Sequence, residues 1–187
     1  QADLNTDFTF KVDLEKTADN KWRVVRIDNF KDFTILVYDA RHTQLENYLK
    51  LLDEIILKHD KIALDYDLQY GKTLSEGSLG SDSTREQLRV LMEKLKIDWE
   101  NRKQEIFALT TPEEAETLQH LWIKICDHQI SYATGYALWM TDKKAETIRD
   151  ADANLKQAKT LEQEAKGLMH RMELDLGFKE IPETPKE

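Results

Sequence analysis

The sequence is poor in the residues that close turns and cross-link a chain. Its 187 residues include 6 glycines, 3 prolines and 1 cysteine. A single cysteine, Cys126, excludes an internal disulfide, so packing has to stabilise the fold. Because turns and sheet corners depend on glycine and proline, their scarcity beside abundant leucine, glutamate, lysine and alanine predicts a mainly helical protein.

Positive charge is also in deficit. The chain has 27 lysines and arginines against 36 aspartates and glutamates, which gives a formal net charge of −9. This balance excludes the phosphate-neutralising surface of a nucleic-acid-binding protein. It also argues against docking on anionic lipid.

The sequence lacks an uninterrupted hydrophobic run. The most apolar stretch, residues 121–140 (LWIKICDHQISYATGYALWM), contains Lys124, Asp127 and His128. A charge at the bilayer centre costs about 2.5 to 3.5 kcal/mol, so we do not expect membrane insertion. Because the chain begins at Gln1 rather than methionine, we expect an exported, cell-envelope protein, with a cytoplasmic protein as the alternative.

Residues 1–29 have the period of β-strands. Apolar and polar residues alternate in TDFTFKVDLEKT, and KWRVVRIDN repeats the alternation with Trp22, Val24 or Val25, and Ile27. The intervening ADNK is typical of a turn, so the segment predicts one β-hairpin. An isolated hairpin is marginally stable in water, and we therefore expect it to pack on the rest of the protein.

The second half of this hairpin, WRVVRIDN, resembles the closing strands of nuclear-transport-factor-2-like and cystatin-like domains. The resemblance covers residues 6–29. It implies that the natural protein extends upstream and that these residues are a fragment of such a domain. Because these folds have many functions, the resemblance implies no activity.

From Phe30 onward the apolar residues recur at helical spacing. We predict four helices, near 30–71, 83–109, 112–141 and 143–176. Their apolar stripes predict a mainly α fold, an up-down four-helix bundle over residues 30–177 with the N-terminal hairpin packed on it. Residues 178–187 form a tail.

Four local signals give the helix ends. Gly71 is suited to the end of the first helix, and Ser83 begins the second with Glu86 in capping-box spacing. Thr111-Pro112 begins the third helix, with proline at the first helical position. Asp142 caps the fourth helix after a tight turn at 141–143.

The stretch 121–140 is predicted to be the central helix of the bundle. Its apolar residues cover well over half of the helix circumference, which is typical of a helix buried on several sides. The additional apolar side needs another element to cover it, and we expect the hairpin to pack there. Ser131 and Gly135, one turn apart, would allow the backbone of a strand to approach closely.

This helix also contains candidate metal ligands and a candidate nucleophile. His120 and His128 are eight residues apart, and Cys126 and His128 are two apart, so neither pair has the spacing for one ion. A Cys126–His59 catalytic pair would need an orienting group that the sequence does not show. We therefore assign no catalytic residue, no metal and no cofactor.

Polar residues on the apolar stripes suggest one candidate pocket. In an up-down bundle the first and third helices are parallel, which would bring His59 near Gln129 and Tyr66 near Tyr136. Buried polar groups need partners, so these side chains either hydrogen-bond one another or surround a small ligand. The candidate ligand-pocket residues are His59, Tyr66, Gln129, Tyr132 and Tyr136.

Two classes of function follow. In both, we expect a binding protein rather than an enzyme. The first is a non-enzymatic protein-binding or structural module of the bacterial cell envelope, acting through the acidic bundle surface or the free edge of the hairpin. The alternative is a small-molecule-binding bundle that uses the interior pocket. Self-association through coiled-coil-like stripes is a third possibility.

Overall fold

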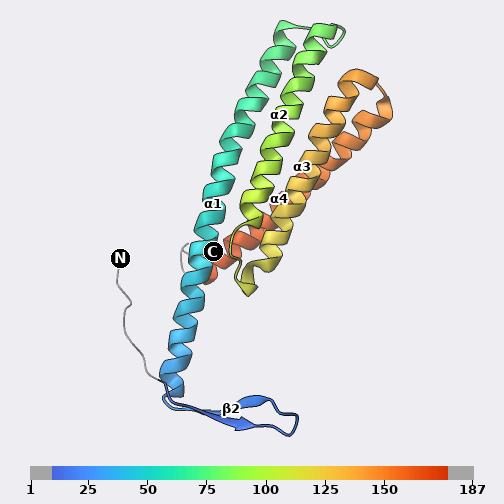
Figure 1. The fold of residues 1–187 in the computed structure, drawn as a ribbon. Helices are drawn as coiled ribbons and strands as arrows, with labels where there is room; N and C mark the ends of the chain where they lie inside the picture. The colour runs from blue at the N-terminus through green and yellow to red at the C-terminus, as the bar shows by residue number, and fades with distance from the viewer. Residues whose placement is uncertain (1–9, 177–187) are drawn as a thin grey trace, which may run out of the picture. The chain divides into compact units, whose positions relative to one another are not determined.

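The computed structural model describes residues 10–176 and confirms the predicted class of fold. Two strands, β1 (Val12–Lys16) and β2 (Trp22–Ile27), precede four long helices (Figure 1). The helices are α1 (Phe30–Glu76), α2 (Asp82–Phe107), α3 (Glu116–Asp142) and α4 (Ala145–Asp175). The predicted tail, 178–187, and the alternation at Phe8 lie outside the described residues.

The chain divides into two compact units, residues 1–44 and 45–187. The division falls inside α1, which begins at Phe30 as predicted. Each unit is therefore considered by itself, and the packing of the hairpin on the bundle stays a prediction.

The hairpin of the first unit has one apolar and one charged face. Val12 lies opposite Ile27 and Leu14 opposite Val24, while Glu15 on the other face pairs with Arg23 at 2.6 Å. A β-bulge between Asp13 and Leu14 leaves an extra residue in β2. The bulge explains why both Val24 and Val25 fit the alternation in the sequence. At the predicted turn, Asn20 adopts a left-handed conformation with φ 66°.

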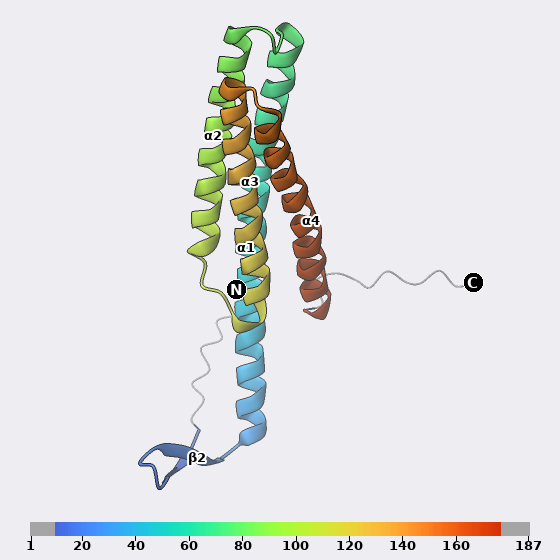
Figure 2. The ribbon, with the colours of Figure 1, turned by 90° about the vertical axis from the view of Figure 1, so that its right-hand side faces the viewer.

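The second unit is a bundle of residues 45–76 of α1 with α2, α3 and α4. The α1–α2 and α3–α4 connections lie at the same end of this bundle, as an up-down order requires (Figures 1 and 2). The predicted apolar stripes are confirmed, since Leu52, Leu88 and Trp122 are all at most 1% exposed. The fully buried core also includes Ile106, Leu118, Ile125, Cys126, Ala133, Ala158 and Ala165.

Two predicted helix ends are wrong by a few residues. Gly71 does not end α1, which continues to Glu76 and is followed by Gly77. Any other residue at Gly77 would bring its Cβ into collision with the side chain of Thr84, so the chain needs glycine there. The N-cap of α2 is Ser81 rather than Ser83, and its side chain accepts a hydrogen bond from the Thr84 amide.

The start of α3 also differs from the prediction. Pro112 is extended, with ψ 151°, and caps a short 3₁₀ turn, Glu113–Ala115, before α3 begins at Glu116. The predicted break between the third and fourth helices is confirmed, with Lys143 left-handed at φ 57°. The N-cap of α4 is Lys144 and not the predicted Asp142, which is the last residue of α3. The Asp142 carboxylate still accepts hydrogen bonds from the Lys144 amide (3.0 Å) and the Thr147 hydroxyl (2.8 Å), which stabilises the start of α4.

The expected role of Gly135 in approaching a strand is wrong, because this glycine faces α4. A Cβ at Gly135 would lie 3.1 Å from the Cβ of Ala151. Ala151, Ala158 and Ala165 recur every seven residues and are at most 1% exposed. Small residues on both helices therefore let α3 and α4 pack closely.

Two of the helical glycines, Gly71 and Gly135, should respond in opposite ways to a side chain. Gly135→Leu should destabilise the protein by about 1 to 3 kcal/mol, because the interface with Ala151 is already filled. Gly71 has nothing within 4 Å of the added Cβ, so Gly71→Ala should stabilise by up to about 1 kcal/mol through helix propensity. Urea unfolding followed by circular dichroism measures both, and a stable Gly135→Leu variant would contradict this packing.

Candidate functional site

The bundle buries three charged or titratable side chains between α1 and α2. His59 of α1 is 2% exposed, and Asp98 and Arg102 of α2 are 9% and 1% exposed. Asp98, Arg102 and Glu105 are four and three residues apart, so they lie on one side of α2. This side of α2 is the most polar part of the interior.

His59 has a carboxylate at each ring nitrogen. Its Nδ1 lies 2.9 Å from Asp98 Oδ1, and its Nε2 lies 3.5 Å from Glu105 Oε2. The other oxygen of Glu105 accepts a hydrogen bond from Lys58 Nζ at 2.6 Å. That hydrogen bond, with the charge of His59, lowers the pKa of Glu105. Lys58, His59, Asp98 and Glu105 form a polar network across α1 and α2.

Arg102 is held between two indole rings. Its guanidinium carbon lies 4.6 Å from the ring centroid of Trp99 and 5.2 Å from that of Trp122, both within cation–π range. Its Nη1 donates a hydrogen bond to Asp60 Oδ1 at 3.0 Å. Among residues 10–176, Nε and Nη2 of Arg102 have no hydrogen-bond partner. Arg102 thus links α1, α2 and α3 through one side chain.

A groove of about 290 Å³ opens beside His59. It is lined by Lys58, His59, Ile62, Asp98, Asn101, Gln104 and Glu105. Six of the seven lining residues are polar or charged, and the charged ones already bond one another. The groove could accept a small polar molecule only in competition with these bonds.

The aromatic side chains around Tyr136 contact one another. The hydroxyl oxygens of Tyr70 and Tyr136 are 2.6 Å apart, and the ring of Tyr136 also contacts Tyr132 and Trp139. The partner of Tyr136 is therefore Tyr70, and the expected pairing with Tyr66 is wrong by one helical turn. Burial raises the pKa of Tyr132 to about 12, so its hydroxyl is neutral at physiological pH.

The five predicted pocket residues do not form one constellation. His59 bonds Asp98 of α2, which corrects the expected contact with Gln129 of α3. Tyr66 is partly buried, and its pKa is raised by burial and by the charge of Asp98. Tyr66 therefore belongs with the charged network, while Tyr132 and Tyr136 form the separate aromatic cluster.

The residues considered as metal ligands or nucleophile have structural roles. Cys126 is fully buried, and burial raises the pKa of its thiol to about 12, which leaves it a poor nucleophile. His128 Nδ1 lies 2.9 Å from Asn154 Oδ1, and Asp127 pairs with Lys103 at 2.6 Å. Within residues 10–176 no group of three or more His, Cys, Asp and Glu side chains could hold a metal ion.

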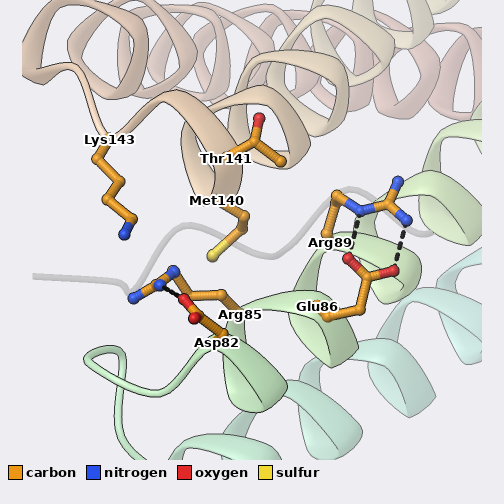
Figure 3. A pocket seen from close by; sticks show the side chains of 7 residues that line it. All are labelled: Asp82, Arg85, Glu86, Arg89, Met140, Thr141 and Lys143. Carbon is orange, nitrogen blue, oxygen red and sulfur yellow. Dashed lines mark hydrogen bonds and ion pairs between the residues drawn. The ribbon is translucent and has the colours of Figure 1, made fainter.

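A second hollow, of about 270 Å³, lies where the start of α2 meets the end of α3 (Figure 3). Two arginines and a lysine line it, which suggests an anion site. Arg89 is bonded to Glu86 at 2.6 Å, however, and Arg85 is paired with Asp82. The paired carboxylates neutralise the arginines, so the hollow offers little net positive charge.

Comparison with protein families, curated proteins and solved structures finds no match to this chain. The resemblance of residues 6–29 to nuclear-transport-factor-2-like domains therefore stays an expectation. In the described part of the chain, no helix is both long and apolar enough to cross a membrane.

Sequence reasoning missed the charged side of α2. Asp98, Arg102 and Glu105 follow the apolar stripe of Leu91 and Leu95, and hydrophobic periodicity alone gives charged residues no place in the core. A signal was present, because Trp99 and Arg102 have the spacing of a helical cation–π pair.

The role of Arg102 gives a first prediction for this site. Arg102→Lys should destabilise by about 2 kcal/mol or more, because a compact ammonium cannot stack between Trp99 and Trp122 and remains a buried charge. Arg102→Met keeps the volume without the charge and should cost less. Asp60→Asn removes the ion-pair partner of this buried charge and should also destabilise the protein. Asp53→Asn, at an exposed position of the same helix, is the matched control and should cost under about 1 kcal/mol. Equal stability of the Lys variant and the native protein in urea unfolding would contradict this role.

The lowered pKa of Glu105 gives a second prediction, for acid stability. A carboxyl whose pKa is lower in the folded state stabilises the fold above its unfolded pKa, near 4.5, and loses this contribution as the pH falls through the folded value. The free energy of unfolding of Glu105→Gln should therefore depend less steeply on pH below about 5. Glu164→Gln, on the exposed side of α4, controls for the change in net charge. Parallel pH profiles for Glu105→Gln and the native protein would contradict the prediction.

Proposed function

We propose that this protein is a non-enzymatic protein-binding module of the bacterial cell envelope, and that its hairpin contacts the partner. The observation that carries the proposal is the exposed apolar face of β1 and β2. Leu14, Trp22 and Val24 on this face are 54%, 65% and 56% exposed. Apolar residues that lie together on an exposed surface are typical of an interaction site.

The edges of the hairpin support the same function. The sheet has two strands, so in the described residues each strand has one edge without a β-partner. Unpaired N–H and C=O groups at an edge can pair with an added strand. A two-stranded sheet is marginal in water, and a partner that covers the apolar face would also stabilise the hairpin.

The bundle interior supports a non-enzymatic role. The titratable groups of the interior include His59, the hydroxyls of Tyr70 and Tyr136, and the thiol of Cys126. The first three are bonded to neighbouring side chains, and the thiol is buried. An acyl-transfer or proton-transfer site would need a nucleophile beside a base, and His59 and Cys126 do not make that contact.

The cellular location is a separate part of the proposal. The acidic charge and the single buried cysteine are compatible with either an exported or a cytoplasmic protein. Fractionation of cells that express the natural gene, with blotting of periplasmic, membrane and cytoplasmic fractions, distinguishes the two.

Site-specific photo-crosslinking tests the role of the hairpin. A benzophenone amino acid at Val24, on the apolar face, should give a crosslinked protein product, whereas the same group at Asp13, on the charged face, should not. The captured protein is then purified, and Val24→Lys should weaken its binding by about tenfold or more, because a charge replaces an apolar contact. Circular dichroism checks that the variant folds.

Two results would overturn this proposal. The first is equal crosslinking from Val24 and Asp13. The second is a product in which Val24 joins only the bundle of its own chain, which would show that the predicted packing of the hairpin on the bundle covers the face.

The second candidate function is small-molecule binding in the groove beside His59. The polar lining, with the half-buried carboxylate of Glu105, favours it. A thermal-shift screen of metals and metabolites tests this candidate, because a ligand specific for the folded state raises the melting temperature. Any shift should disappear in His59→Gln, and a shift that persists would place the ligand elsewhere.

A further inference from the structure

α1 carries a row of exposed leucines on the side that does not face the bundle core. Leu57, Leu64 and Leu68 are 52%, 58% and 64% exposed. Their spacings of seven and four residues place them on one side of the helix. All three belong to the unit formed by residues 45–187. This side has the spacing of a helix that packs against another helix.

An acidic row runs along one edge of these leucines. Its members, Glu46, Asp53, Asp60 and Asp67, recur every seven residues. Asp60 is bonded to Arg102, whereas Asp53 and Asp67 are exposed. The other edge is mixed, with Lys58, Asp65 and Lys72, and Glu54 and Lys61 have the same heptad position as Leu68. The leucine row is therefore bordered by strong negative charge on one side only.

We infer that this leucine row binds an amphipathic helix of a partner protein that carries lysine or arginine along one edge. Leucines at heptad-like spacing accept the apolar side of such a helix, and the basic edge would lie against the acidic row. Opposite charges across an interface fix the orientation and increase the association rate. The leucine row belongs to the bundle, so binding there does not depend on the function proposed for the hairpin.

A second copy of this chain fits the leucine row less well. In an antiparallel pair of α1 helices, the acidic row of one copy would face the acidic row of the other. In a parallel pair it would face Lys58, Asp65 and Lys72, of which Lys58 is already bonded to Glu105. The antiparallel pair therefore brings like charges together, and in the parallel pair one lysine is already bonded elsewhere. Both arrangements are less favourable than binding of a basic partner.

Two synthetic helices test the inference directly. Both fluorescent peptides are about three heptads long with the same apolar seam, and one edge carries arginine in the first and glutamate in the second. Fluorescence anisotropy with the full chain should give a Kd about tenfold or more lower for the arginine peptide. The difference should shrink at high salt, because exposed charges are screened.

Variants of the protein locate the binding. Leu64→Lys should weaken binding of the arginine peptide by about tenfold or more, because it places a positive charge in the leucine row. Asp53→Lys with Asp67→Lys should remove or reverse the preference between the peptides. Ile97→Lys, at a 55% exposed position of α2, and Glu164→Lys on α4 are matched controls and should leave binding unchanged. Leu57→Ala with Leu68→Ala repeats the test without adding charge.

Three outcomes would overturn the inference. Equal affinity for the two peptides would show that the acidic row does not select the partner. Binding unaffected by both leucine variants would place the peptide on another surface. A native dimer that Leu64→Lys converts to monomer in light scattering would show that the row joins two copies. Val24→Lys should leave peptide binding unchanged, so failure of the hairpin proposal remains distinguishable.

Discussion

The alignment of α1, α2 and α3 depends on the groups that surround one buried cation. Arg102 is 1% exposed, and a buried charge is costly unless other groups compensate it. Compensation comes from Asp60 of α1, Trp99 of α2 and Trp122 of α3. A shift of α1 by one turn would separate Asp60 from the guanidinium, so the ion pair favours one register of these three helices.

The contact of His59 with Asp98 follows from the same register. His59 and Asp60 are adjacent on α1, and Asp98 and Arg102 are one turn apart on α2. When Asp60 meets Arg102, the same alignment brings His59 to Asp98. Each of these two contacts leaves part of the buried side chain unpaired, since within residues 10–176 His59 Nε2 and Arg102 Nε and Nη2 have no hydrogen-bond partner. The contacts hold α1 and α2 in one alignment.

The buried side of a helix could be predicted, because the spacing of the apolar residues shows which side of the helix they share. The expected stripe of α1, which includes Leu45, Leu52, His59 and Tyr66, is buried or partly buried in the structure. The end of α1 could not be predicted from Gly71, because a helical glycine costs only about 1 kcal/mol and the following residues favour continuation. α1 ends at Glu76 instead, and a Cβ at the following Gly77 would collide with the Thr84 side chain unless that side chain moved.

Contacts between helices were harder to predict than the faces of single helices. The period of a sequence gives the direction of a side chain but does not give the axial offset between two helices. The aromatic pairing was therefore assigned to Tyr66 instead of Tyr70, one turn away on the same stripe. Gly135 was assigned to the hairpin for a similar reason, since its small size indicates a close neighbour without identifying it. The partner, Ala151, is also small and gave no hydrophobic signal.

α1 and α4 differ in a way that bears on function. α4 buries a narrow row of alanines at Ala151, Ala158 and Ala165, and its remaining surface is largely polar. α1 buries large side chains on one side and also exposes leucines on another. A helix with apolar residues on two sides is typical of one that packs between two layers, and the core of this bundle supplies only one. The exposed leucines lie beside an acidic row in a chain whose net charge is −9, so a second layer would be most favourable if it were basic.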